Sequence, residues 1–189
     1  MQRAGNTINT NTMHKSARED GVAFFDKYLK GNFEGKKVLD VGSLNINGSL
    51  RYIFPQGQYT GIDMVDGNGV DIVCNAHEMP FSDESFDAVI STSCFEHDEM
   101  FWLTFLEMCR VAKPEGFIYM NAPNNGKYHG HPGDCWRFYE DSGKALETWA
   151  VRSGYNVKLI ENYIDRSWPY FHNCVNIWKK ELRSEDATV

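Results

Sequence analysis

The chain has little of what marks several protein classes. It contains five cysteines in 189 residues and no C-x-x-C pair, so neither a disulfide framework nor a zinc–thiolate site is expected. No apolar run approaches the roughly 18–20 residues that a membrane-spanning helix needs. The start, MQRAGNTINTNT, is too polar for a secretory signal peptide and is not an arginine-rich transit sequence. These absences favour a cytoplasmic protein that does not enter a membrane.

Basic residues are also scarce. The sequence has 19 Lys and Arg against 26 Asp and Glu, which gives a formal net charge of −7. A protein that holds a nucleic-acid backbone relies on clustered Lys and Arg, so this balance argues against nucleic acid as the partner. A small-molecule partner is expected instead, and the oligomeric state is left open.

The chain shows no internal repeat, low-complexity block or Pro/Gly/Ser-rich linker. Its length fits one domain with a sizeable core. We predict a flexible leader over residues 1–15 and a single domain over residues 16–189.

Strands alternate with helices along this domain. Apolar spacing predicts helices over 16–29, 48–54, 99–112 and 141–153. It predicts strands over 37–41, 58–63, 70–74, 86–92, 117–122, 156–161 and 171–179. The alternation predicts an α/β fold with a doubly wound, Rossmann-like, mostly parallel sheet of seven strands and helices on both faces.

Two neighbouring segments have the layout that a nucleoside cofactor requires. VLDVGSLNINGSL reads as a buried strand that carries Asp40, followed by a turn at Gly42, and YTGIDMVDG reads as a second strand that ends in Asp63. The glycine turn lets a ligand approach backbone N–H groups, and a carboxylate about 20 residues on can accept two hydrogen bonds from ribose hydroxyls. Ligands of such sheets bind at the carboxyl ends of the strands, where Asn75 and Ser93 are also expected.

Four segments in this order resemble the class I S-adenosylmethionine-dependent methyltransferases, in particular their type 11 branch. The segments are VLDVGS, TGIDM, NAHEMPFSDESFDAVISTSCFEH and RVAKPEGFIYMNAPN, and the resemblance covers about residues 36–155. It implies an antiparallel last strand and S-adenosylmethionine as the cofactor, with S-adenosylhomocysteine as its product. It also implies methyl transfer to O or N of a small polar metabolite, such as a sugar or a natural-product intermediate.

The resemblance further implies which residues contact the cofactor. They are Asp40, Gly42 and Ser43 at the methionine end, Asp63 at the ribose, Met64, Asn75 and Ala76 at the adenine, and Ser93 beside the methionine moiety. Three of these roles have a plain structural alternative, because Asp40 can cap the turn, Met64 can fill the core and Asp63 can be a surface carboxylate.

The glycine turn departs from the family pattern, which usually runs D-x-G-x-G-x-G. Leu44 and Ile46 stand at the second and third glycine positions, and the next glycine is Gly48. The turn must therefore take another path, in which Asn47 and Gly48 supply the positive φ angles.

Methyl transfer from a sulfonium is an in-line displacement, so the protein must align the acceptor and remove its proton. After the fourth predicted strand the chain reads Ser93-Cys94-Phe95-Glu96-His97. Ubiquinone-pathway and small-RNA methyltransferases look similar here, with an E-x-x-E-H run that binds a divalent metal. Because Ser93 replaces the first carboxylate, we predict no metal. The alternative is a metal on Glu96 and His97 that His129 or His131 completes; otherwise Glu96 and His97 order the following helix.

The run NNGKYHGHPGDCWRFYED follows the fifth predicted strand, where acceptor loops lie in this fold. We predict His131 or Asp134 as the proton acceptor, with His97 as the third catalytic residue. The alternative is structural: Trp136 and Phe138 pack inward, and Arg137 pairs with Asp134 to brace the loop.

Three other function classes fit the sequence less well. A nucleic-acid or protein methyltransferase is disfavoured, because no N/D/S-P-P-Y/F run follows the fourth predicted strand. A nicotinamide-dependent oxidoreductase would need G-x-G-x-x-G, which is absent. The altered glycine turn keeps open a protein that binds the cofactor without catalysis.

Overall fold

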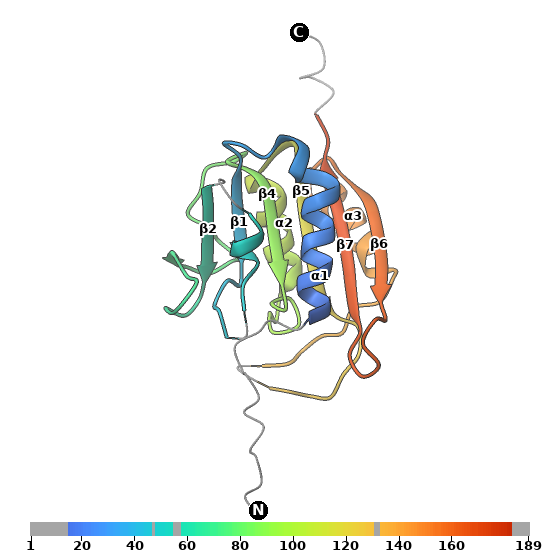
Figure 1. The fold of residues 1–189 in the computed structure, drawn as a ribbon. Helices are drawn as coiled ribbons and strands as arrows, with labels where there is room; N and C mark the ends of the chain where they lie inside the picture. Colours follow the sequence, from blue (N-terminus) through green and yellow to red (C-terminus); the bar gives the residue numbers. More distant parts are fainter. Residues whose placement is uncertain (1–14, 47, 55–57, 131–132, 183–189) are drawn as a thin grey trace, which may run out of the picture.

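The computed structural model describes residues 15–46, 48–54, 58–130 and 133–182. Its centre is a seven-stranded sheet in the order β3-β2-β1-β4-β5-β7-β6 (Figure 1). The strands are β1 (Lys37–Val41), β2 (Gln58–Asp63), β3 (Ile72–Val73), β4 (Phe86–Thr92), β5 (Ala112–Pro123), β6 (Val157–Asp165) and β7 (Asn173–Lys180). Strands β1 to β5 pair in parallel, whereas β7 is antiparallel to both β5 and β6. The predicted doubly wound sheet and its antiparallel last strand are confirmed.

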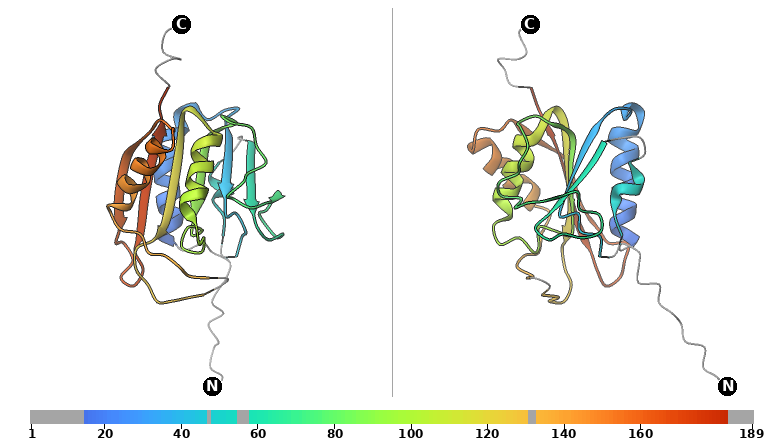
Figure 2. Two further views of the ribbon diagram at one scale, coloured as in Figure 1. Left: turned by 180° about the vertical axis from the view of Figure 1, so that it is seen from behind. Right: turned by 90° about the vertical axis from the view of Figure 1, so that its left-hand side faces the viewer.

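Helices cover both faces of the sheet, as predicted. The helices are α1 (Lys15–Phe24), α2 (Phe101–Val111) and α3 (Ser142–Arg152), with a π turn η1 (Phe25–Leu29) and 3-10 turns η2 (Lys30–Asn32) and η3 (Leu50–Ile53). Figure 2 shows α1 and η3 on one face and α2 and α3 on the other. None of the helices in the described part of the chain has the length and apolar character needed to cross a bilayer.

The two faces have separate cores, because successive side chains of a strand point to opposite sides of the sheet. In β1, Val38 belongs to the core under α1, and Leu39 belongs to the core under α2 and α3. Phe24 of α1 packs on Tyr119 with ring centroids 4.8 Å apart. On the other face Phe105 of α2 packs on Trp178 at 4.7 Å. Such buried aromatic pairs contribute about 0.5–1.5 kcal/mol each beyond the area that they bury.

Several element boundaries differ from the predictions for physical reasons. The predicted helix 48–54 is only the 3-10 turn η3, and β3 is two residues long at the exposed edge of the sheet. Strand β5 begins directly after α2, since the residue before Pro114 favours extended backbone. The helix predicted over 141–153 is α3; Asp141 makes no side-chain capping bond, and Gly154 follows the helix with φ +93°. Lys15 begins α1, and the rest of the predicted leader lies outside the described residues.

A buried polar group attaches α1 to the sheet. Asp20 is 7% exposed, and its carboxylate accepts hydrogen bonds from Asn121 Nδ2 and Tyr163 Oη, each at 3.0 Å. Burial, and then the negative charge of Asp165, raise the pKa of Asp20 to about 6. The folded protein therefore holds this proton more tightly than the unfolded chain does.

We expect Asp20→Asn to change how stability depends on pH. Because the pKa is raised on folding, the Asp20 contribution is fully present below pH 4 and is lost as pH rises to about 6, by about 3 kcal/mol. The free energy of unfolding of the variant, relative to wild type, should rise by about that amount between pH 4 and pH 7. Urea denaturation at each pH measures it, with the exposed Asp26→Asn as the matched charge control. A difference that stays constant across this range would contradict the prediction.

Candidate functional site

The turn after β1 requires glycine at position 42. Gly42 has φ +79°, and a Cβ built on it would lie 2.5 Å from both Cβ and Sγ of Cys94. The backbone N–H groups of Gly42 and Ser43 both donate to the carbonyl of Ile62, at 2.9 and 3.0 Å. The turn is therefore fixed between the ends of β2 and β4, at the switch point of the sheet.

The turn takes a different path after Ser43, as the missing glycines predict. The N–H of Asn45 donates to the carbonyl of Asn68 at 2.7 Å, which ties the turn to the loop after β2. The Asn45 side chain then accepts from the N–H of Gly48 at 2.7 Å. Gly48 has the predicted positive φ, at +126°, whereas Asn47 lies outside the described residues.

Asp63 lies at the end of β2 and faces the turn. One of its carboxylate oxygens accepts from the N–H of Leu44 and the other from the N–H of Val65, each at 3.1 Å. Each oxygen of an ionised carboxylate can accept a second hydrogen bond, so both retain room for a ribose hydroxyl. Met64 is 71% exposed, which excludes the core-filling alternative.

The remaining cofactor candidates lie around the same edge of the sheet. Asp40 is 6% exposed and accepts from the hydroxyl of Tyr59 at 2.6 Å, while burial raises its pKa to about 6. The buried Ser43 hydroxyl has no partner among the described residues. Asn75 is exposed and accepts from the N–H of His77 at 2.9 Å.

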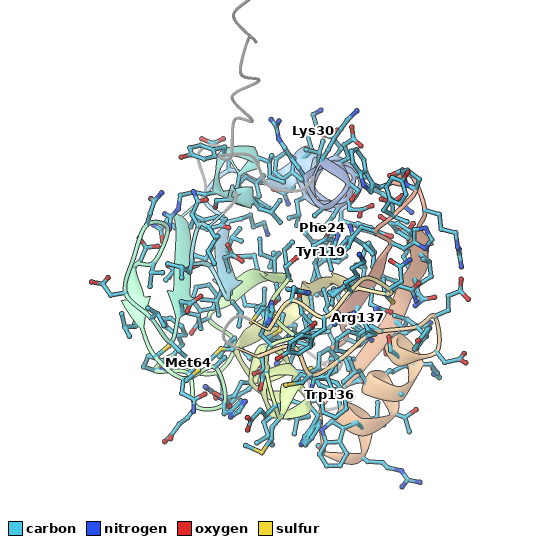
Figure 3. The ribbon with its side chains drawn as sticks, turned by 90° about the horizontal axis from the view of Figure 1, so that it is seen from below. Phe24, Lys30, Met64, Tyr119, Trp136 and Arg137 are labelled. Atoms are coloured by element: carbon cyan, nitrogen blue, oxygen red, sulfur yellow. The ribbon has the colours of Figure 1, made fainter. Side chains whose placement is uncertain are left out.

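Two further candidates flank this edge. Ala76 is half-buried against the core, and Ser93 adopts φ +52°, a strained conformation for a residue other than glycine. The N–H of Ser93 donates to the carbonyl of Asn121 at 2.8 Å. Seen along the strands in Figure 3, Met64 marks one side of this edge, and Trp136 and Arg137 mark the loop across from it.

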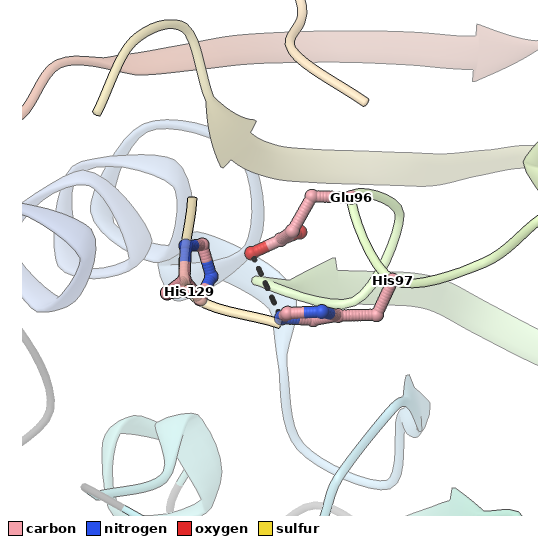
Figure 4. Close-up of side chains that lie close together, drawn as sticks. All are labelled: Glu96, His97 and His129. Atoms are coloured by element: carbon pink, nitrogen blue, oxygen red, sulfur yellow. Dashed lines mark ion pairs between the residues drawn. The ribbon is translucent and has the colours of Figure 1, made fainter. Parts of the chain in front are cut away.

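Side chains from two distant parts of the sequence meet at the turn after β4. Ligand-type atoms of Glu96, His97 and His129 all lie within 4.8 Å of one another (Figure 4). Glu96 is 1% exposed, and its Oε2 has no hydrogen-bond partner within the described ranges. Burial raises the pKa of Glu96 to about 7. From the sequence, His129 was only one of two histidines that could complete a metal site. In the structure it is a member of the group.

The loop after β5 is braced by an ion pair. Asp134 binds Arg137 through two contacts, at 2.5 and 2.7 Å, and also accepts from the N–H of His129 at 2.9 Å. Arg137 is the main reason that the pKa of Asp134 is lowered. A carboxylate held in this way is a weak proton acceptor. The pairing matches the structural alternative for Asp134, and His131 lies outside the described residues.

The aromatic residues of this loop divide between core and surface. Phe138 is buried in the core, as the structural alternative predicted. Trp136, in contrast, remains 37% exposed and donates from Nε1 to the carbonyl of Asp98 at 2.9 Å. The N–H groups of Cys135 and Trp136 both donate to the carbonyl of Glu96, at 2.7 and 3.2 Å. These bonds bring the loop against the turn after β4, which no sequence pattern indicated.

Comparison with known proteins agrees with this architecture. Residues 39–120 match the family described as "Methyltransferase domain". A fatty-acid O-methyltransferase of Mycolicibacterium smegmatis is 29% identical over 109 residues, which are 49% of this chain and 39% of the relative. The chain therefore spans about two fifths of that relative's length.

Two solved structures share the fold. The 1,6-didemethyltoxoflavin-N1-methyltransferase of Burkholderia thailandensis, solved with S-adenosylhomocysteine, has a TM-score of 0.69 at 15% identity and covers 88% of this chain and 79% of its own. The cyclase SpnF has a TM-score of 0.66 at 12% identity and covers 91% and 83%. Residues 39–120, less than half of the chain, thus resemble the methyltransferase domain of the type 11 branch of the class I S-adenosylmethionine-dependent methyltransferases, and the solved structures share its fold.

Proposed function

We propose that the protein transfers the methyl group of S-adenosylmethionine to an oxygen or nitrogen atom of a small polar metabolite. The observation that carries this proposal is one edge of the sheet, where the Gly42 turn, the Asp63 carboxylate and the Glu96–His97–His129 group lie together. The family match and the S-adenosylhomocysteine bound by the Burkholderia enzyme support the choice of cofactor.

The residues at this edge fit the cofactor on their own geometry. Gly42, with its positive φ, packs directly on Cys94, which holds the turn close to the end of β4. Asp63 would hold the ribose diol, and Met64, Asn75 and Ala76 would surround the adenine. Asp40, Ser43 and Ser93 would line the methionine end. When bound, the cofactor supplies an electrophilic sulfonium methyl group, and the protein supplies alignment and proton removal.

The acceptor is proposed to lie between the turn after β4 and the loop at 124–140. The Glu96–His97–His129 group would receive or direct the acceptor's proton there, with His97 as its half-buried predicted member. Asp134 is better suited to position His129, because Arg137 holds it in its ionised form. The exposed rings of Tyr128 and Tyr139 on this loop suit a ring-shaped acceptor such as a sugar.

Two alternatives to methyl transfer onto a small metabolite are tested in the same experiment. A fold that is shared with a cyclase leaves room for cofactor binding without methyl transfer. A nucleic-acid acceptor would require cationic surface that a net charge of −7 does not favour.

The experiment is transfer of labelled methyl from S-adenosylmethionine into fractionated metabolites, with RNA, DNA and peptide mixtures assayed in parallel. We expect label in the metabolite fraction, and we expect His97→Ala to lower turnover by about 10²–10⁴-fold while S-adenosylhomocysteine binding persists. His172→Ala is the control, because His172 lies directly before β7 and is not a member of the Glu96–His97–His129 group. Label in RNA or peptide alone would reject the metabolite assignment, and bound S-adenosylhomocysteine with no label anywhere would favour the non-catalytic alternative.

A further inference from the structure

The Glu96–His97–His129 group has the geometry of ligands around one ion. Nε2 of His97 lies 3.7 Å from Oε1 of Glu96, which is too long for a hydrogen bond between them. A tetrahedral ion with bonds of about 2.0–2.1 Å holds its ligand atoms about 3.3 Å apart. The three ligand atoms therefore need only small movements to share one cation.

Both histidines have acceptors close to Nδ1. Nδ1 of His97 bonds to the carbonyl of Gly133, which leaves Nε2 with its lone pair towards Glu96. Nδ1 of His129 lies 3.2 Å from the carbonyl of Lys127 and 3.3 Å from Asp134. Metal-binding histidines characteristically donate their other N–H to a carbonyl or a carboxylate in this manner.

Glu96 supplies the second, independent observation. It is almost fully buried, yet its Oε2 has no partner among the described residues, and a buried unpaired carboxylate oxygen is costly. A cation bound by this carboxylate would satisfy that oxygen and offset the cost of burying its charge.

We propose that Glu96, His97 and His129 bind one divalent transition-metal ion that joins the turn after β4 to the loop after β5. Two imidazoles and one carboxylate suit Zn²⁺ or Co²⁺ better than Mg²⁺ or Ca²⁺. Three protein ligands leave a coordination position open, as in catalytic zinc sites. If the proposed function holds, this open position receives the hydroxyl group of the acceptor, and the metal lowers the pKa of that hydroxyl. The binding of the metal does not depend on the proposed function.

The test is titration of the chelator-treated, full-length protein with Co²⁺ and then Zn²⁺. We expect one Co²⁺ per chain with visible ligand-field absorption, which Zn²⁺ displaces. Glu96→Gln and His129→Ala should weaken Co²⁺ binding at least 100-fold, and Asp134→Asn should weaken it by about 10–100-fold through His129. Circular dichroism and S-adenosylhomocysteine calorimetry confirm that each variant is folded.

Two controls separate this site from other ligands. Cys135→Ser removes an exposed thiol from the same loop, and His172→Ala removes a histidine from outside the group; both should leave Co²⁺ affinity unchanged. Binding that is lost in Cys135→Ser, binding that survives in His129→Ala, or no stoichiometric binding at all would each overturn the proposal. Methyl transfer that continues in chelator without metal would overturn the role of the open coordination position in binding the acceptor, and would leave the proposed function standing. Stoichiometric Co²⁺ binding without methyl transfer would overturn the proposed function and leave the metal site standing.

Discussion

Replacing Gly42 with alanine is expected to destabilise the protein by roughly 2–5 kcal/mol and to abolish measurable cofactor binding. A left-handed φ of +79° costs an alanine about 1–2 kcal/mol. The new methyl group would also meet Cys94 at 2.5 Å, and overpacking of this kind costs about 1–3 kcal/mol. Urea denaturation measures the first effect, and calorimetry with S-adenosylhomocysteine measures the second.

Gly35→Ala is the matched control for this prediction. Gly35 also has a positive φ, at +73°, but a Cβ built there meets nothing within 4 Å. It should therefore show the cost of the backbone conformation alone, with cofactor affinity intact. Cys94→Gly, made in the Gly42→Ala background, should recover part of the stability by removing the contacting atoms. Equal destabilisation at positions 42 and 35 would show that the contact with Cys94 does not constrain the turn.

Asp63→Ala should weaken S-adenosylhomocysteine binding by about 10²–10⁴-fold. Two hydrogen bonds from the ribose to a charged carboxylate contribute about 1.5–3 kcal/mol each. The substitution also deprives the N–H groups of Leu44 and Val65 of their acceptor, which loosens the turn and the following loop. Asp63→Asn, which keeps one side-chain oxygen, should fall between wild type and Asp63→Ala. Isothermal titration calorimetry gives the affinity of each variant.

The control for Asp63 is Asp66→Asn, an exposed carboxylate on the same loop. Asp66→Asn removes the same charge three residues from Asp63, so a long-range electrostatic effect on the cofactor should be similar in Asp66→Asn and Asp63→Ala. An Asp63→Ala protein that is folded and binds S-adenosylhomocysteine with wild-type affinity would contradict the ribose assignment. So would an equal loss of affinity in Asp66→Asn.

The sequence predicts the centre of the sheet well because β1 and β4 are largely buried on both faces. The predicted ranges 37–41, 58–63 and 86–92 agree with β1, β2 and β4, whose apolar runs are bounded by turn residues. The edge was less predictable. Residues 70–74 were predicted as a strand, but β3 keeps two paired residues, since an exposed edge has no packing to extend it.

The candidate site was predictable only where local geometry determines it. The need for glycine at position 42 and positive φ at Gly48 followed from turn chemistry. The meeting of His129 with Glu96 did not, because it depends on a loop folded back by bonds to the Glu96 carbonyl. The partnership of Tyr59 with Asp40 was also missed. It requires the register of two parallel strands, in which Asp40 lies opposite Gly61.

Asn121 connects helix α1 to the backbone of Ser93 after β4. Its side chain holds α1 through Asp20, and its carbonyl holds the strained backbone of Ser93. Exchanging the amino-terminal helix for that of another enzyme, as a route to a new acceptor range, would therefore disturb the backbone of Ser93, which is proposed to line the methionine end of the cofactor. Libraries that vary α1 should keep Asp20 and Asn121 fixed as a pair, or vary them together.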